Sequence, residues 1–335
     1  MIEEKRKNIV VIGGGTGTVS ILNGVKSNPD LHISVIVSMM DDGGSNHVVR
    51  DEFGLLPLSD LRKSIIGLAR AGNGTFRDLF TYRFNKGEGL SGHTLGNLIM
   101  MALSDISGSE VAAIKEAGKI FGVLGDVIPV TLDHVRLVAH YSNGEKVTGE
   151  HYIDEPENLS DSTKIDELTL EPNAQAYPEA LEAIRNADFI IAGPGDLYTS
   201  TLANIVVDGV SEAIRDSNAK YIFVNNLMTK HGQTHWMKAA DLVDEITRYS
   251  ERTPDIVLQN NREIPEHILR KYAENKEFKI EDNLDEYEHV YEVIRTDLIG
   301  EDEITRTSGD TLKRSLIRHD SKKLAEVLYE IFSRI

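Results

Sequence analysis

The chain has 335 residues, of which 27% are charged, and its formal net charge is −18 at pH 7. Nucleic-acid-binding surfaces gather Lys and Arg against phosphates, so this balance argues against a nucleic-acid partner. The absence of cysteine excludes disulfides, thiolate nucleophiles and cysteine-based zinc sites. No apolar run approaches the about 18 residues of a membrane span, and no secretory signal pattern is present. We therefore expect a cytoplasmic protein without a membrane span.

The first predicted element is an apolar strand at 9–12 that runs directly into the glycine-rich segment 13–17. Glycines let the backbone turn sharply and bring its N–H groups close to an anion. A helix predicted over 18–28 would point the positive end of its dipole at the same place. The candidate phosphate-binding residues are Gly14, Gly15, Thr16 and Gly17.

Segment 13–17 departs from the dinucleotide fingerprint, because Thr18 stands where a third glycine would be required. It also lacks the Gly-Lys-Ser/Thr ending of a P-loop. An NAD-binding oxidoreductase is therefore disfavoured, although it stays open as an alternative. A glycine turn that only joins a strand to a helix is the other alternative.

A second apolar strand at 32–40 ends in Asp-Asp-Gly-Gly-Ser at 41–45. Strand, helix and strand with glycine loops at both strand ends predict a parallel βαβ unit whose loops meet at one sheet edge. The paired carboxylates could bind Mg²⁺ beside phosphates, accept sugar hydroxyl protons, or form an ordinary solvated turn. The candidate ligand-binding residues are Asp41, Asp42, Gly43, Gly44 and Ser45, and the two aspartates are also the candidate Mg²⁺ ligands.

Helical spacing dominates the next stretch, with helices predicted over 59–71, from Thr75, over 93–104 and from Ser109. Arg62, in the first turn of the first helix, could reach a phosphate or could be an ordinary surface arginine. His93 and Asn97 are four residues apart, so we expect them to share a helix face and to contact the ligand. A structural histidine is the alternative for His93.

An alternating stretch at 135–147 contains Asn143-Gly144, which favours a type I′ turn and predicts a β-hairpin. We interpret it as an antiparallel insertion at about 130–150. Residues 150–176 are polar and acidic, and we expect a surface connection there.

The second half of the chain repeats the design of a strand followed by a glycine loop. A core strand at 188–192, preceded by a helix at 178–186, leads into a third glycine loop at 193–200. Glycines allow close backbone approach and hydroxyls can donate, so this loop is the expected second half of a ligand site. Its candidate residues are Gly193, Gly195, Thr199 and Ser200.

The remaining predicted elements are strands at 221–224 and 256–258 and helices at 236–249, 265–274 and 320–332. Four or more strand-to-helix steps predict a doubly wound, mainly parallel, Rossmann-like α/β fold with three layers. We treat 1–335 as a single domain, with the hairpin insertion and an acidic C-terminal segment at about 262–335.

Seven segments together resemble the CofD/YvcK-like family over nearly the whole chain. They are VVIGGGTG at 10–17, DDGGS at 41–45, SDLRK at 59–63, GHTLGN at 92–97, EPNAQAYPEALEAIRNADFIIAGPGDLYTS at 171–200, NNLMTKHGQT at 225–234 and LIRHDSKKLA at 316–325. One branch of this family is 2-phospho-L-lactate transferase. The other is the YvcK branch, called gluconeogenesis factor, which looks like a UDP-sugar-binding regulator of carbon use and of cell-envelope growth or cell shape.

The GHTLGN helix, the GPGDLYTS loop and the terminal RHD resemble the YvcK branch. The resemblance implies a nucleotide-sugar ligand such as UDP-N-acetylglucosamine, a homo-oligomer and no catalytic residue. It implies that Tyr272 and Arg318 contact the ligand, and we expect Asn226 to bind sugar or ribose. Asp196 and Lys230 depart from the family pattern. The competing hypothesis is a Mg²⁺-dependent phosphate-group transferase with the metal on the paired aspartates.

Overall fold

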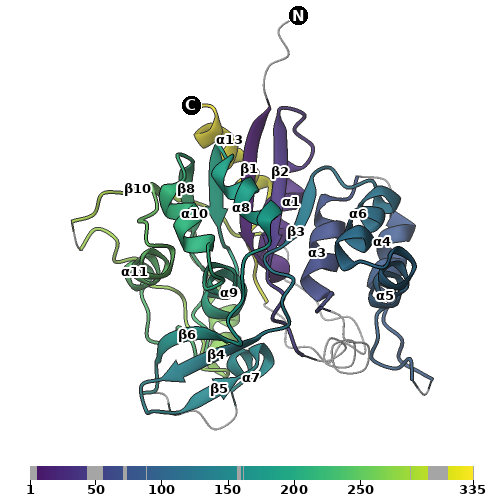
Figure 1. Cartoon of the computed structure of the whole chain (residues 1–335). Helices are drawn as coiled ribbons and strands as arrows, with labels where there is room; N and C mark the ends of the chain where they lie inside the picture. The colour runs from purple at the N-terminus through teal and green to yellow at the C-terminus, as the bar shows by residue number, and fades with distance from the viewer. Residues whose placement is uncertain are drawn as a thin grey trace, which may run out of the picture.

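The computed structural model describes residues 6–43, 56–70, 74–87, 89–156, 160, 162–286, 288–300 and 316–334. Its centre is a seven-stranded sheet in the order β10-β9-β8-β7-β1-β2-β3, in which every neighbouring pair is parallel (Figure 1). The strands are β1 (Lys7–Gly13), β2 (Leu31–Val37), β3 (Asp126–Pro129), β7 (Phe189–Ala192), β8 (Lys220–Val224), β9 (Ile256–Asn260) and β10 (Glu292–Thr296). The predicted doubly wound α/β fold is confirmed.

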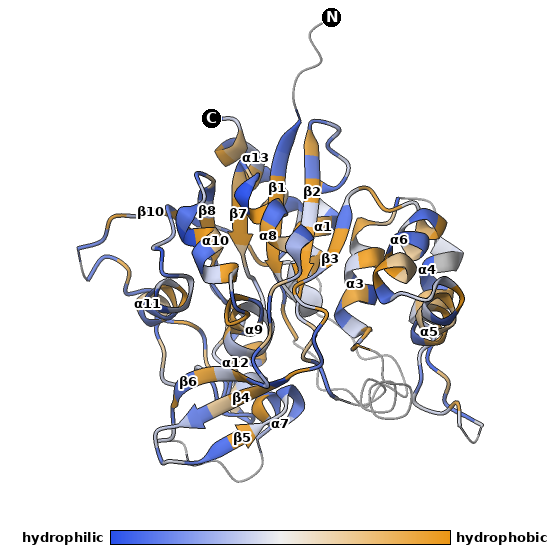
Figure 2. Ribbon diagram, in the orientation of Figure 1, coloured by the Kyte–Doolittle hydropathy of each residue, from blue (hydrophilic) through white to orange (hydrophobic). Residues whose placement is uncertain are grey.

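The strand order reverses between β1 and β7. From β1 the chain moves outward through β2 to β3, and from β7 it moves the other way through β8 and β9 to β10. Ligands of doubly wound folds bind outside the carboxyl ends of the strands at such a reversal. The central strands are buried on both faces over most of their length and consist mainly of apolar residues, which Figure 2 shows in orange.

Two layers of helices cover the sheet. On one face α1 packs against α3 and α13, and on the other α10 packs against α8 and α11 (Figure 1). The helices are α1 (Gly15–Val25), α3 (Ser59–Leu68), α4 (Gly74–Thr81), α5 (Leu95–Ser107), α6 (Glu110–Phe121), α7 (Glu150–Asp154), α8 (Pro178–Arg185), α9 (Ala203–Ile205), α10 (Val210–Asp216), α11 (Ala239–Ser250), α12 (Glu266–Ala273) and α13 (Ser321–Phe332), with a π-helix, η1, at Leu197–Leu202. Nowhere in the described ranges is a helix both long and apolar enough to cross a membrane.

A second, antiparallel sheet has the order β5-β4-β6, built from β4 (Arg136–Tyr141), β5 (Lys146–Thr148) and β6 (Ile165–Glu171). The predicted hairpin is confirmed, because β4 and β5 pair around the Asn143-Gly144 turn. The expected surface connection at 150–176 is wrong, because this stretch contains α7 and β6. Ile165, Leu168 and Leu170 of β6 are buried, whereas the acidic residues between them face solvent and conceal the strand in the composition.

Two strands of the main sheet, β3 and β10, and the π-helix η1 were not predicted from the sequence. The two strands lie at the edges of the main sheet, and both are short. Edge strands carry a weaker apolar signal, because only one neighbour pairs with them. The π-helix has no distinct sequence signal, since its apolar spacing differs little from that of an ordinary helix turn.

The last helix closes the face of the sheet next to the first helix. Asp320 caps α13 by accepting hydrogen bonds from the N–H groups of Lys322 (2.8 Å) and Lys323 (3.0 Å). The Tyr329 hydroxyl donates to the Gly24 carbonyl of α1 at 3.1 Å. The predicted helix at 320–332 is therefore confirmed, and it fixes the position of α1 behind the first glycine loop.

Candidate functional site

Three predicted glycine loops meet at the carboxyl edge of the main sheet. A Cβ added to Gly17 would lie 2.2 Å from the Pro194 carbonyl oxygen, so the first and third loops touch through bare backbone. A Cβ on Gly14 would lie 2.3 Å from Oδ2 of Asp60, at the first turn of α3. Asn226, after β8, donates from its amide to the Gly195 carbonyl at 2.8 Å. The structure thus brings these predicted residues together.

Helix α1 begins at Gly15 without a side-chain cap, so its first N–H groups point into this junction. Thr18, the residue that breaks the dinucleotide fingerprint, is fully buried and its hydroxyl donates to the Gly14 carbonyl at 3.0 Å. The side chain therefore supports the loop from inside the helix. A loop supported by this threonine differs from the dinucleotide-binding loop, which has glycine at the same position.

The second loop contributes Asp41, Asp42 and Gly43, whereas Gly44 and Ser45 lie outside the described residues. Asp42 is buried, and one of its carboxylate oxygens accepts the His151 N–H of α7 at 3.0 Å. The Gly43 N–H donates to Asp41 at 3.0 Å. Helix α7 of the small sheet is therefore attached to the second loop.

Arg62 is buried and does not behave as a surface arginine. Its Nε donates to the Asn97 side chain at 3.2 Å, and its Nη1 donates to the Phe80 carbonyl at 3.5 Å. Burial, and secondarily Arg83, lower the pKa of Arg62 to about 10, so it keeps its charge at neutral pH. The structure therefore joins Arg62 and Asn97, two of the predicted site residues.

The predicted common helix face of His93 and Asn97 is wrong. Helix α5 begins at Leu95, and Thr94 caps it by accepting the Asn97 N–H at 3.2 Å. His93 therefore precedes the helix, half-buried, while Asn97 is fully buried beside Arg62. The helix thus begins two residues after the predicted start at His93.

Two charged groups that were not predicted, Lys63 and Glu150, lie near the carboxylates of the second loop and of Asp60 in α3. Lys63 pairs with Asp60 at 2.8 Å. Burial opposes its charge, but Asp60 and Asp41 outweigh burial and raise the pKa of Lys63. Burial and the nearby Asp41 raise the pKa of Glu150, the first residue of α7, well above its ordinary range. A cation or hydroxyl donor from a ligand would relieve this excess of negative charge.

A second polar cluster lies where α7 meets the third loop. The Asp154 carboxylate accepts hydrogen bonds from the Thr199 hydroxyl (3.4 Å), the Lys230 ammonium (3.2 Å) and the Gln233 amide (3.1 Å). Asp196 lies 3.6 Å from the same ammonium. Burial raises the pKa of Asp196 to about 6, with Asp154 adding to the shift and Lys230 opposing it. Of these residues, only Thr199 was a predicted ligand-binding residue.

Tyr272 contacts the segment that precedes α13 and contains Arg318. Tyr272 is buried in a small apolar cluster with Leu227, and its hydroxyl accepts the N–H groups of Leu316 (2.9 Å) and Ile317 (3.3 Å). Burial lowers the pKa of His319 to about 4, although a hydrogen bond with the Asn225 backbone opposes the shift. Tyr272 thus fixes the segment that brings Arg318 beside the end of β8.

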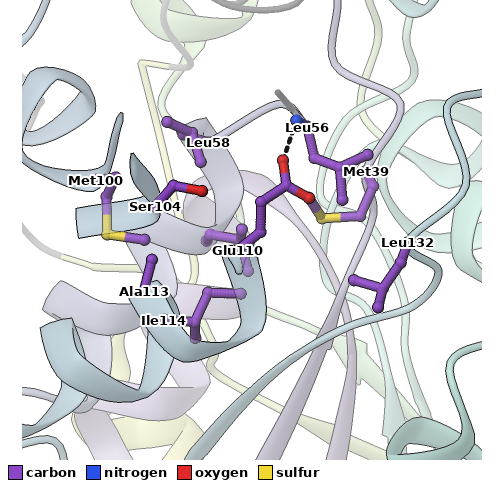
Figure 3. A pocket seen from close by; sticks show the side chains of 10 residues that line it. Met39, Leu56, Leu58, Met100, Ser104, Glu110, Ala113, Ile114 and Leu132 are labelled. Atoms are coloured by element: carbon purple, nitrogen blue, oxygen red, sulfur yellow. Dashed lines mark hydrogen bonds between the residues drawn. The ribbon is translucent and has the colours of Figure 1, made fainter. Parts of the chain in front are cut away.

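An apolar void lies next to the second loop but is too small for a ligand (Figure 3). Its volume is about 10 Å³, and Met39, Leu58 and Met100 are among the side chains that point into it. Glu110 accepts the Leu56 N–H at 2.6 Å on its rim. Because that volume holds about one water, the void cannot hold a substrate.

No group of three or more His, Asp and Glu side chains within the described ranges is arranged to hold a metal ion. Mg²⁺ commonly takes one or two protein carboxylates together with water and the phosphates of its ligand. Asp41 and Asp42 fit that mode, although one oxygen of Asp42 already accepts the His151 N–H. A metal there would depend on oxygens that the ligand brings.

The amino-acid sequence matches a known family. A family model described as 2-phospho-L-lactate transferase CofD matches residues 9–299. The chain belongs to the CofD family. All three glycine loops, α7 and the cluster around Asp154 lie within the matched range of this CofD-family chain.

Relatives and solved structures cover nearly all of this CofD-family chain. A protein of Thermotoga maritima is 39% identical over 323 residues, covering 96% of this chain and 98% of that protein. The gluconeogenesis factor of Bacillus subtilis is 35% identical over 330 residues, covering 98% of each. A crystal structure of a Bacillus halodurans protein superimposes with a TM-score of 0.87 at 33% identity, over 97% of this chain and all of that one. The similarity to gluconeogenesis factors thus extends over the full fold.

Proposed function

We propose that this CofD-family chain is a cytoplasmic, nucleotide-sugar-binding regulatory protein of the gluconeogenesis-factor type. Its ligand is a UDP-sugar such as UDP-N-acetylglucosamine, and its role concerns carbon metabolism and the cell envelope or cell shape. The observation that carries the proposal is the contact of the first and third glycine loops, with Gly17 against Pro194, at the strand-order reversal. Backbone N–H groups converge there with hydroxyl and amide side chains, which suits a diphosphate joined to sugars.

Each part of the ligand has a matching set of groups. The open N–H groups at the start of α1 and the third loop would hold the diphosphate. Arg62, Lys63 and Arg318 would balance its charge. The Asp41 carboxylate would accept hydrogen bonds from sugar or ribose hydroxyls, and the Asn226 amide would contact the same hydroxyls. Such a protein acts through a ligand-dependent change in the population of its states, so no catalytic base is required.

A transferase is the second candidate, and the family model named after 2-phospho-L-lactate transferase favours it. In that case Mg²⁺ on Asp41 and Asp42 would neutralise phosphate charge, and positioning would supply most of the rate. The buried Thr18 at the first loop gives the NAD-binding alternative no support. A homo-oligomer remains part of the proposal.

Calorimetric titration of the full chain separates these candidates. We expect saturable binding of UDP-N-acetylglucosamine or UDP-glucose with and without Mg²⁺, and weaker binding of GDP and NAD. Metal-dependent turnover of a phosphodiester donor would replace the regulatory function with the transferase. Binding of NAD alone would rule out both.

A further inference from the structure

Helix α7 connects the two sheets through contacts at both of its ends. At its start, the His151 N–H donates to Asp42 of the second loop at 3.0 Å. At its end, Asp154 receives donors from Thr199 of η1 and from the turn that carries Lys230 and Gln233. A five-residue helix thus lies across the strand ends where the glycine loops meet.

The three donors around Asp154 form a set typical of an oxyanion site. A hydroxyl, an ammonium and an amide N–H converge on one carboxylate, at 3.4, 3.2 and 3.1 Å. Charge-assisted donors of these kinds also bind the oxygens of a phosphate. The donors lie on η1 and on the turn after β8, whereas the anion lies on α7, between β5 and β6 of the small sheet. The anion and its site are therefore separable parts of the molecule.

A second observation indicates that this set accommodates more than Asp154. Gln233 is fully buried, and its Oε1 has no hydrogen-bond partner among the described residues. A buried acceptor is normally paired, so an unpaired one marks a place for a missing donor. A sugar hydroxyl next to a phosphate would supply that donor while the phosphate took the amide N–H.

The charge balance permits an exchange at this position. Asp196 lies 3.6 Å from Lys230, so carboxylates already outnumber the ammonium. An added anion would raise the repulsion, but a phosphate that replaces the Asp154 carboxylate leaves the count of negative groups nearly unchanged. Displacement of the Asp154 carboxylate by the phosphate is therefore favoured over binding of the phosphate beside Asp154.

We propose that Thr199, Lys230 and Gln233 form an oxyanion subsite that Asp154 occupies from within, and that the phosphate of a sugar phosphate displaces it and detaches α7. The inference rests on the proposed function, since the ligand is taken to be a nucleotide sugar. It adds a subsite and a means by which binding is converted into a change of shape. Strand β6 stays fixed to α11, because the Leu168 N–H donates to the Tyr249 hydroxyl at 2.7 Å.

Affinity measurements on variants of the full chain test the exchange. Asp154→Asn removes the internal anion, so we expect it to bind UDP-N-acetylglucosamine about tenfold more tightly, the effect of losing one charge-assisted competitor. Lys230→Met should bind about tenfold more weakly for the same reason. Glu155→Gln is the matched control, because Glu155 is the exposed neighbour of Asp154 and undergoes the same change of charge. Equal or weaker affinity in Asp154→Asn than in Glu155→Gln would overturn the proposal.

Hydrogen exchange and fluorescence measure the detachment itself. At saturating ligand, amide exchange should rise at 150–155 and stay unchanged at 165–171. The single tryptophan, Trp236, shares its turn with Lys230 and Gln233 and lies 3.8 Å beneath the Lys164 ammonium. Its emission should shift on ligand binding and, without ligand, in Asp154→Asn but not in Glu155→Gln. Unchanged exchange at 150–155 in the saturated protein would overturn the proposal.

A failure of the proposed function gives a different result. If the wild-type chain binds no nucleotide sugar, the regulatory function fails, and titration with inorganic pyrophosphate still decides the subsite. Tighter pyrophosphate binding by Asp154→Asn than by Glu155→Gln supports the subsite. Equal binding, or none by either variant, overturns it.

Discussion

Gly17 lies in the narrowest contact of the site, where two loops approach each other through their backbones. A methyl group at this position would lie 2.2 Å from the Pro194 carbonyl oxygen, which is backbone and cannot rotate away. The two loops must separate to admit it. Side-chain chemistry therefore plays no part in the requirement for glycine here.

We predict that Gly17→Ala lowers ligand affinity more than tenfold and destabilises the protein by about 1–3 kcal/mol, the usual range for overpacking. Calorimetry and urea denaturation measure the two effects. Gly118→Ala is the control, because its added methyl group would meet nothing closer than 3.9 Å inside α6. That control should gain about 0.5–1 kcal/mol from the better helix propensity of alanine. Equal effects of the two substitutions would contradict the close-contact explanation.

Among the single residues of the site, the sequence predicted those that directly follow a strand of the main sheet better than those that come close only through tertiary contacts. Gly14, Gly17 and Asn226 follow strands directly, so their position at the sheet edge follows from the fold. Asp154 and Lys230 do not follow this rule. They meet only because the small sheet folds back over the main one, a tertiary contact that no local pattern encodes.

Helix α13 shows how one cap can support an element far from it in sequence. Its Asp320 side chain accepts two backbone N–H groups, and the helix packs against α1 behind the first glycine loop. Loss of the cap should loosen the first turn of α13, because those N–H groups would lose their partner.

Asp320→Ala is expected to lower the free energy of unfolding by about 1 kcal/mol, the typical value for a lost N-cap. Urea denaturation followed by circular dichroism measures this change. Glu326→Ala, on the exposed face of the same helix, should leave stability within about 0.5 kcal/mol of wild type. A comparable loss in both variants would show that the cap has no special role.

Elements with long apolar runs were predicted from the sequence, whereas a strand whose apolar residues are interrupted by acids was not. The central strands are mostly apolar, so β1, β7 and β8 were placed within a few residues. In β6 the apolar residues are separated by acids and a threonine, so the acidic composition concealed the strand. The strand gains its stability from pairing with β4 and from Tyr249, neither of which is visible locally.

The whole molecule couples its stability to pH through His319. This side chain is buried, and burial lowers its pKa from the ordinary value of 6.5 to about 4. In the unfolded chain the imidazole takes up a proton below about pH 6.5. Between these values the unfolded state binds more protons, so the stability contributed by neutral His319 is present above pH 6.5 and is lost as pH falls toward 4.

We predict that wild type loses about 2 kcal/mol more than His319→Gln between pH 7 and pH 5, from the linkage of these two pKa values. Urea denaturation at both values measures the difference. Asp196 acts in the opposite sense, because burial raises its pKa to about 6 and the folded state is the one that takes up the proton. Since both proteins carry Asp196, its effect cancels in the comparison. Identical losses in the two proteins would contradict the assignment to His319.

The contact between α13 and α1 also orders events during synthesis. The ribosome releases α1 and β7 before α13, so the side of α1 at Gly24 and the ring of Phe189, which lie against Ala325 and Phe332 of α13 in the finished fold, stay uncovered until α13 has been synthesised. A chain that ends before α13 would present that apolar surface to chaperones and proteases. The fold therefore links support of the first glycine loop to synthesis of α13, and chains that terminate before α13 should be degraded.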